Sequence, residues 1–177
     1  MSDEGNKGSE SSSEWANLTP DCLLEVFSKL TVDEMLDGPM QVCKPWSQGG
    51  NMAVYSTFGF GTRTAPLPAS GEFDWDAMEE KMDALLQAFV DRSKGGLKSI
   101  KIKLCTDKSI SYVADNCPDL VVLWLTSCPS VTDASILKIA SKCKKLKEVC
   151  VRSSGGITEN SLNMVKQNCP KVQILNN

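Results

Sequence analysis

The second half of the sequence contains an internal repeat of 26 residues. Cys117, Cys143 and Cys169 mark this period, and apolar positions after each cysteine fall in phase with it. The in-phase sets are Leu120, Leu146 and Val172; Leu123, Val149 and Leu175; Leu125 and Val151; and the segments 132–136 and 158–162, with an earlier copy at 106–110 that follows a three-residue deletion. Units of this length bury their apolar surface against their neighbours, so the period predicts a stacked array.

Each unit is predicted to contain one strand, one turn and one helix. The run Leu120, Leu123, Leu125 is short and alternates at its end, which is typical of a strand with one buried face. Thr132 can cap the helix that follows, and Asp133 then lies at the positive end of the helix dipole. The predicted fold class is therefore an α/β solenoid, with strands inside and helices outside, of about three repeats and a partial fourth over residues 97–177.

The repeat also resembles a known family. Residues 117–136 follow the pattern C-P-x-L-x-x-L-x-L-x-x-C-x-x-V-T-D-x-S-I, which is similar to the cysteine-containing class of leucine-rich repeats. The next unit departs from it, with Lys144 in place of the proline and Ser154 in place of the second cysteine. The resemblance implies that the cysteines fill buried positions along the stack.

The chain has eight cysteines and no histidine. A zinc site is not expected because no C-x-x-C pair occurs and no histidine can complete one. A cysteine nucleophile would lack a histidine base, and a reducing compartment argues against disulfides. We therefore predict structural packing for most thiols, and an outward-facing position for Cys150, which alternates with two valines. The thiols predicted to pack are Cys105, Cys117, Cys128, Cys143 and Cys169.

Charge divides the chain into two blocks. Residues 1–94 carry 16 acidic and 7 basic side chains, a net −9, and residues 95–177 carry 6 and 12, a net +6. Two blocks of opposite sign suggest two domains. The basic block could bind nucleic acid through the lysines at 142–147, but no aromatic stacking platform accompanies them and a solvated face is favoured.

The N-terminus predicts a chain that is not exported. Residues 1–14 are acidic and rich in serine and glycine, so we expect a disordered tail without a secretory signal. No apolar run reaches the length of a membrane span. We expect a location in the nucleus, the cytoplasm or both.

Residues 15–50 predict a small all-α unit. Thr19 is a good helix cap before Pro20, and Thr31 with Glu34 forms a capping box for a second helix. Gly38 with Pro39 can then start a third. Three short helices are too small to bury their apolar surface alone, so the surplus stripe needs a partner.

This segment resembles an F-box, with L-x-P-x-x-L-L-x-x-V-F-x-x-L followed by V-C-x-x-W. Together with the repeats, the chain is similar to plant F-box/leucine-rich-repeat proteins. The resemblance implies an F-box that docks a Skp-family adaptor, and through it a cullin–RING ligase of the SCF type, while the repeats bind a protein substrate for ubiquitination and proteasomal degradation. It places the F-box core and adaptor face at Leu18, Pro20, Leu23, Leu24, Phe27, Leu30, Val42, Cys43 and Trp46. The alternative is that these nine residues only hold the helices together.

The sequence departs from the family after Trp46. Pro45 and the run Ser47–Gly50 should shorten the third helix. Residues 51–72 show no clear period and are predicted to be a linker or irregular loop. The chain also stops just after a fourth strand begins, so it is expected to be a short form or a fragment of a longer array.

Residues 73–96 predict an amphipathic helix that caps the array. Asp74 or Asp76 can cap its start and Gly95 with Gly96 its end. Its apolar stripe is expected to pack on the first repeat rather than to form a methionine-lined groove. The stripe contains Trp75, Met78, Met82, Leu85, Leu86, Phe89 and Val90.

Side chains between the buried leucines should point away from the helices. Trp124, flanked by lysine and arginine, is the best candidate for a substrate contact because Trp and Arg are enriched at binding hot spots. Alternatively, Trp124 lies flat on its neighbours and contacts only its own chain. The predicted substrate-binding set is Trp124, Lys101, Lys103, Cys150 and Arg152. No catalytic residue, cofactor or metal is expected, which leaves a non-catalytic substrate receptor or, alternatively, an interaction scaffold with a degenerate F-box.

Overall fold

The computed structural model describes residues 18–27, 29–30, 34, 38, 57–59 and 74–176. The predicted tail at 1–14, much of the predicted F-box and most of residues 51–72 lie outside this set. The elements are α1 (Pro20–Phe27), β1 (Thr57–Gly59), α5 (Trp75–Ser93), β2 (Ser99–Lys103), α6 (Asp107–Asn116), β3 (Val122–Thr126), α7 (Asp133–Lys142), β4 (Glu148–Arg152), α8 (Glu159–Asn168) and β5 (Gln173–Asn176).

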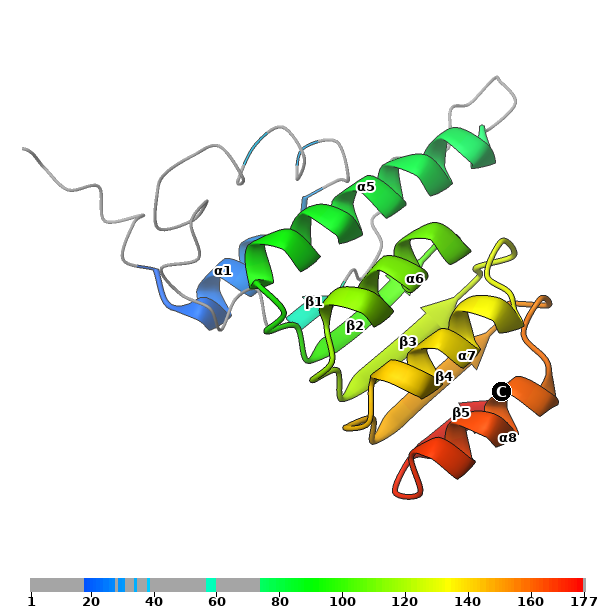
Figure 1. Ribbon diagram of the computed structural model, residues 1–177. Coiled ribbons are helices and arrows are strands. Elements are labelled where there is room, and N and C mark those ends of the chain that lie inside the picture. Colours follow the sequence, from blue (N-terminus) through cyan, green and yellow to red (C-terminus); the bar gives the residue numbers. More distant parts are fainter. Residues whose placement is uncertain are drawn as a thin grey trace, which may run out of the picture.

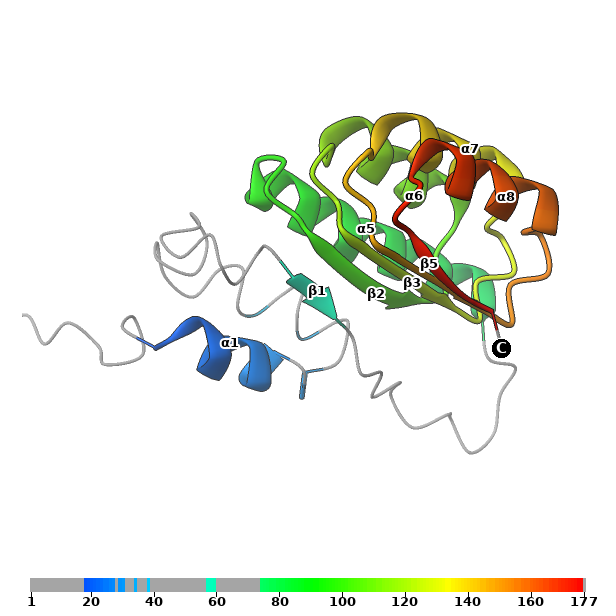
Figure 2. The same ribbon diagram turned by 90° about the horizontal axis from the view of Figure 1, so that it is seen from below.

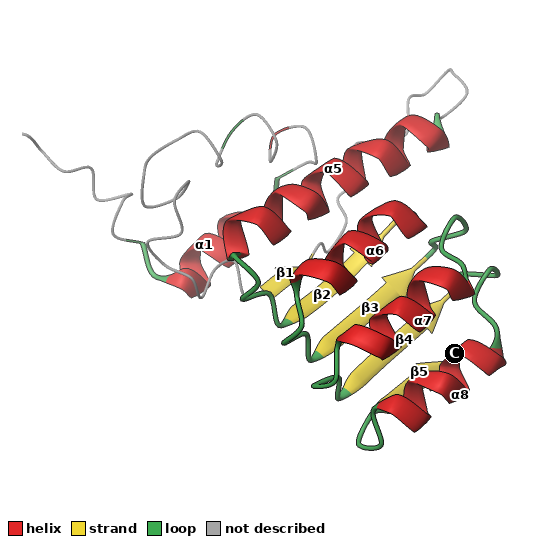
Figure 3. Cartoon of the chain, in the orientation of Figure 1, coloured by secondary structure: helices red, strands yellow, loops and turns green. Residues whose placement is uncertain are grey.

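The fold is α/β, as predicted, with one parallel sheet and a layer of helices. The strands follow the order β1-β2-β3-β4-β5, and every neighbouring pair is parallel. Helices α5 to α8 lie side by side over one face of this sheet (Figures 1 and 2). Strand and helix alternate along the chain from α5 onward (Figure 3). This order places each helix beside the helix of the neighbouring unit.

The predicted helix caps are present at the start of the units. Thr106 Oγ1 accepts a hydrogen bond from the Lys108 N–H at 3.1 Å, and Thr132 Oγ1 accepts one from the Ala134 N–H at 3.3 Å. Thr158 occupies the same position before α8 without such a bond. These caps pair N–H groups that the first turn of a helix leaves without an intrahelical partner.

A second contact joins each cap to the preceding helix. The Asp83 carboxylate accepts from both the N–H and the hydroxyl of Thr106, at 3.0 and 2.5 Å. The same double contact joins Asp107 to Thr132, at 2.8 and 2.5 Å, and Asp133 to Thr158, at 2.7 Å for both bonds. We call these three contacts the Asp–Thr ladder. Hydrogen bonds to a charged carboxylate are stronger than neutral ones, so the ladder fixes the spacing of neighbouring helices.

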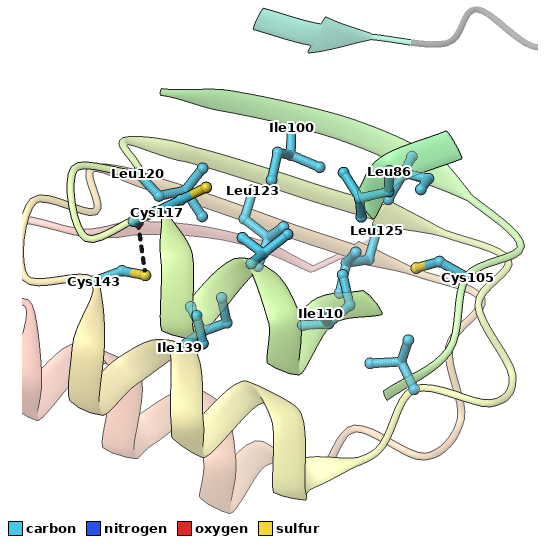
Figure 4. Packing of buried hydrophobic residues seen from close by; sticks show 14 of the residues in the cluster. Leu86, Ile100, Cys105, Ile110, Cys117, Leu120, Leu123, Leu125, Ile139 and Cys143 are labelled. Atoms are coloured by element: carbon cyan, nitrogen blue, oxygen red, sulfur yellow. Dashed lines mark hydrogen bonds between the residues drawn. The ribbon is translucent and has the colours of Figure 1, made fainter. Parts of the chain in front are cut away.

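The core lies between the sheet and the helices (Figure 4). Leu120, Leu123 and Leu125 are buried there, as the repeat predicts. All five cysteines predicted to pack are also buried, each with 2% or less of its surface exposed. This burial confirms the prediction that these cysteines serve as small apolar core residues.

Helix α5 covers the first side of the array. Asp74 caps it by accepting from the Ala77 N–H at 2.9 Å, and the helix ends where Lys94 and Gly95 take positive φ values of 48° and 81°. Its predicted stripe is buried at Met82, Leu85, Leu86, Phe89 and Val90, with Met78 packed against the core. Trp75, however, is 57% exposed, so its assignment to the stripe is wrong. Trp75 is the first residue of the helix, directly after the cap Asp74.

Two expectations about the strands are corrected. Residues 57–59, inside the predicted irregular loop, form strand β1 and pair with Ser99 to Lys101 of β2. In the last unit, Val149 pairs with Ile174 and not with Leu175. One residue fewer separates the cysteine from the inward position in this unit, so Ile174 is half-buried while Leu175 is 42% exposed.

Among the described helices, none is long and apolar enough to cross a membrane.

Candidate interaction face

The candidate site lies on the side of β2, β3 and β4 that points away from helices α6 to α8. We call it the Trp124 face. Strand alternation selects its members, because the residues between them, such as Leu123 and Leu125, are buried in the core. The register aligns them in three rows: Ser99, Val122 and Glu148; Lys101, Trp124 and Cys150; and Lys103, Thr126 and Arg152.

Trp124 is held in place by contacts within the chain. The Lys101 Nζ atom lies 4.0 Å from the centroid of the indole ring, a cation–π contact. On its other side, the indole Nε1–H donates to Glu148 Oε1 at 2.6 Å. The ring is half-buried. Trp124 therefore points away from the core, as predicted, and it also contacts its own chain, as the alternative reading predicts.

Glu148 lies on the Trp124 face but is absent from the predicted substrate-binding set. It stands in the row beside Trp124, and its carboxylate both satisfies the indole N–H and places a negative charge among the three cations of this face. The sequence contained the signal, because the same register that selects Trp124 also puts Glu148 on the outward side. An anion that binds here would have to lie toward Lys103 and Arg152, away from Glu148.

Cys150 does not present a free thiol on this face. It alternates with Val149 and Val151, yet only 1% of its surface is exposed. In register it lies between Trp124 and Leu175, two much larger side chains on the adjacent strands. A short side chain between two long ones is shielded from solvent. The register keeps Cys150 on the outward side of the sheet, as predicted, but its assignment to the substrate-binding set is wrong because the thiol is buried.

The three cations of the Trp124 face differ in their accessibility to a ligand. Lys101 and Arg152 are exposed, whereas Lys103 is half-buried and makes a contact within the chain. Lys101 is also engaged with the indole ring. Arg152 is therefore the most accessible charge of the predicted set.

The second predicted set belongs to the F-box-like segment. Thr19 accepts from the Cys22 N–H at 3.4 Å, as expected for a cap. Leu23 is buried, with 5% of its surface exposed, and Leu18 and Leu30 pack against the same hydrophobic cluster. Three further members of this set, Pro20, Leu24 and Phe27, lie in α1, and Val42, Cys43 and Trp46 lie outside the described residues.

Helix α1 has both a buried and an exposed apolar residue. Leu23 supports the fold, while Val26, which was not in the predicted set, is 37% exposed. Val26 lies near the end of α1 and is accessible to another chain.

The buried thiols are arranged as a second ladder. Cys143 Sγ donates to the Cys117 carbonyl, and Cys169 Sγ donates to the Cys143 carbonyl, both at 3.4 Å (Figure 4 draws the first). Burial raises the pKa of Cys117 to about 11 and that of Cys143 to about 12. A raised pKa keeps a thiol protonated, and the thiol form is a poor nucleophile and a poor metal ligand.

Cys105 and Cys128 form a separate pair, with their sulfur atoms 3.5 Å apart. The Cys105 thiol donates to Cys128, which raises the pKa of Cys105 and lowers the pKa of Cys128. Both sulfurs are fully buried. No group of three or more potential metal ligands occurs in the part of the chain that the structure describes.

Two curated proteins of Arabidopsis thaliana are similar to this chain. F-box/LRR-repeat protein 19 is 42% identical over 120 residues, which are 67% of this chain and 40% of that protein. F-box protein SKIP1 is 38% identical over 124 residues, which are 70% of this chain and 41% of that protein. The chain thus spans well under half the length of these relatives. No protein-family model matches it.

Proposed function

From its relationship to plant F-box/leucine-rich-repeat proteins, we propose that this chain is a substrate-recognition subunit of an SCF-type ubiquitin ligase. The observation that carries the proposal is the coexistence in one chain of an F-box-like helical segment and a repeat array. The name of one relative includes both parts, and the name of the other includes the F-box. In this proposal residues 15–50 are the F-box and residues 97–177 are the leucine-rich repeats.

The proposed architecture of the array is a leucine-rich-repeat solenoid of about three units and a partial fourth. The parallel register of β2 to β5, the helices on one side and the Asp–Thr ladder support it. Each feature recurs with the repeat, as a stacked array requires.

The proposed mechanism needs no catalytic residue. The F-box binds a Skp-family adaptor, the repeats bind a protein substrate, and the cullin–RING ligase brings a ubiquitin-loaded enzyme to the same particle. The rate gain comes from the raised effective concentration of the substrate beside that enzyme. The proposed site of action is the nucleus, the cytoplasm or both.

The Trp124 face is the proposed substrate surface. It combines an aromatic ring held at a fixed angle by Lys101 and Glu148 with the exposed cation of Arg152. A preorganised aromatic side chain loses little conformational freedom on binding, which favours affinity. The substrate region that meets Arg152 is expected to be acidic.

Binding of a purified Skp-family adaptor tests the proposal. We expect saturable heat in calorimetry and co-elution with the full chain. Val26→Asp should raise the Kd at least about tenfold, because it puts a charge into an exposed apolar position of α1. The matched control is Leu137→Asp, which makes the same kind of change at an exposed position of α7 and should leave the Kd unchanged.

Leu23→Asp is the structural comparison in this experiment. It should abolish binding together with the fold of the segment, since Leu23 is buried. If the wild-type chain gives no heat and no co-elution, the receptor function is refuted. The second candidate, an interaction scaffold with a degenerate F-box, would then stand, favoured by Pro45 and the glycine-rich run after Trp46.

A further inference from the structure

A pocket of about 470 Å³ lies at the edge of the sheet where β3, β4 and β5 begin. Three successive units contribute to it through the segments that lead from a helix into a strand (Figure 1). Its lining residues are Val121, Lys144, Lys145, Leu146, Lys147, Cys169, Pro170 and Lys171. It shares no residue with the Trp124 face and belongs to neither of the predicted sites.

The inner part of the pocket is apolar. Leu146 and Cys169 are each 2% exposed and form its base, and the half-buried Val121 and the ring of Pro170 extend this apolar surface outward. The volume falls within the roughly 300–1,000 Å³ that binding pockets usually have. It is large enough for an aliphatic side chain and the backbone on either side of it.

The rim of the pocket is basic. Two of its four lysines already have partners: Lys144 donates to the Ala140 carbonyl at 3.0 Å and to Asn168 Oδ1 at 2.9 Å, and Lys145 pairs with Asp119 at 2.8 Å. Lys147 and Lys171 are exposed, and within the described residues no hydrogen bond or ion pair joins either ammonium group.

Lysines near the end of a helix often bond its last carbonyl groups, but this role does not account for Lys147 and Lys171. Lys144 does play that part, since it bonds a carbonyl in the last turn of α7. Lys147 and Lys171 come after the ends of α7 and α8 and lie beside the pocket instead. With no acidic residue in the lining, the rim attracts a negatively charged partner.

We propose that this pocket binds an acidic peptide segment of a partner protein, which inserts one aliphatic side chain between Val121 and Leu146 and sets its flanking carboxylates against Lys147 and Lys171. An extended peptide suits the site, because the side chains two positions before and after the inserted residue point to the same face and can reach the lysines of the rim. A nucleic acid suits it less, because no aromatic residue lines the pocket to stack on a base. The proposal does not depend on adaptor binding.

Fluorescence anisotropy with a short labelled peptide tests the site. The probe carries one leucine in the middle of a run of aspartates and glutamates, and we expect saturable binding to the full chain. Replacing that leucine by serine, or making the double variant Lys147→Glu with Lys171→Glu, should weaken binding at least about tenfold. The control double variant, Lys108→Glu with Lys166→Glu, alters net charge equally at exposed positions of α6 and α8 and should change affinity less than about twofold.

Each other outcome overturns the proposal. Equal losses in both double variants would show attraction to net charge alone, and an unchanged affinity for the serine peptide would show that the pocket is empty in the complex. Absence of saturable binding would exclude the site. A single-stranded oligonucleotide that displaces the probe more effectively than the unlabelled peptide would assign the basic rim to nucleic acid instead. Circular dichroism of every variant establishes that the fold is kept.

Discussion

At the scale of single residues, cysteine shows how position decides chemistry. Cys117 and Cys143 fill the core, and the Cys143 thiol donates to the Cys117 carbonyl. Their burial was predicted from the resemblance of the repeat to cysteine-containing leucine-rich repeats and from the lack of any partner for another role. For Cys150 the prediction of a binding role failed. Strand alternation gives the direction of a side chain, while its exposure depends on the size of its neighbours across the sheet. One of these neighbours, Leu175, was predicted to be in phase with the inward residues and lies beside Cys150 instead.

The thiols should differ sharply in their reaction with an alkylating reagent. Cys22 is exposed and should be modified rapidly in the native chain, whereas the buried thiols should react only as fast as the protein opens. The slow set is Cys105, Cys117, Cys128, Cys143, Cys150 and Cys169. Mass spectrometry of peptides after timed iodoacetamide treatment measures each rate, and denaturant should make all of them fast.

Modification of Cys117 or Cys143 at the rate of Cys22, without denaturant, would contradict the packing of the thiol ladder. The variant Cys117→Ser sharpens the comparison, because it puts a hydroxyl where the structure has a fully buried sulfur. It should destabilise the fold by about 1–3 kcal/mol as measured by urea unfolding.

At the scale of elements, the Asp–Thr ladder makes stability depend on pH. Burial by itself raises the pKa of Asp107, but hydrogen bonds from Ser135 and Thr132 outweigh it and hold the pKa below 3.8. The pKa of Asp133 is also lowered, first by the Thr158 N–H. A carboxylate with a lowered folded pKa stabilises the fold above its ordinary pKa, and this contribution is lost as the pH falls through the lowered value.

Asp107→Ala should therefore cost stability near neutral pH and progressively less in acid. We expect the free energy of unfolding at pH 7 to fall by about 1 kcal/mol, less than hydrogen bonds to a charged group usually contribute, because the carboxylate is partly exposed. Well below pH 3.8 the variant and the wild type should unfold at similar temperatures. Thermal melts followed by circular dichroism over this pH range provide the measurement.

Asp115→Ala is the control for this effect. Asp115 pairs with Lys138 on the surface at 2.6 Å, and exposed ion pairs contribute little. A pH-independent cost of Asp107→Ala, or an equal cost at Asp115, would show that the ladder does not stabilise the array through its charge.

The repeat predicted most of the elements, and its exceptions have physical causes. Strand β1 was missed because three residues, Thr57–Gly59, are too few to show alternation, and they form a strand only because β2 offers an edge. The register of β5 was missed because Ile174 and Leu175 are both apolar, so a shift of one residue leaves the pattern intact. Pairing with the neighbouring strand decides which of these two apolar residues points inward, a choice that the sequence pattern leaves open.

At the scale of the whole molecule, α5 is part of the array although it lacks the repeat. It buries Leu85 and Leu86 completely, its Asp83 begins the Asp–Thr ladder, and its Glu79 accepts from the Ser130 hydroxyl at 2.7 Å. The sequence predicted the covering stripe, but these two buried carboxylates have no signature within the helix itself. Their partners lie 23 and 51 residues away along the chain.

The array should therefore not fold without α5. A chain that begins at residue 97 leaves apolar core residues uncovered and should show neither a cooperative melt nor native helix content. A chain that begins at residue 73 keeps the helix and should melt cooperatively. Circular dichroism distinguishes the two, and a cooperative transition in the shorter chain would show that the helix is dispensable.

The Asp–Thr ladder has a consequence for how such a chain can change over evolution. The units of α6 and α7 each carry both complementary halves of the contact: the threonine that donates backward to the preceding helix, and the aspartate that accepts from the unit after it. Helix α5 carries only the accepting half, in Asp83. A duplicated or deleted unit of this kind thus restores the same pairing at its new junctions, and every threonine keeps an acceptor. Gain and loss of whole units is then far better tolerated than an insertion of any other length, and arrays of different size can descend from one ancestor without redesign of their joints.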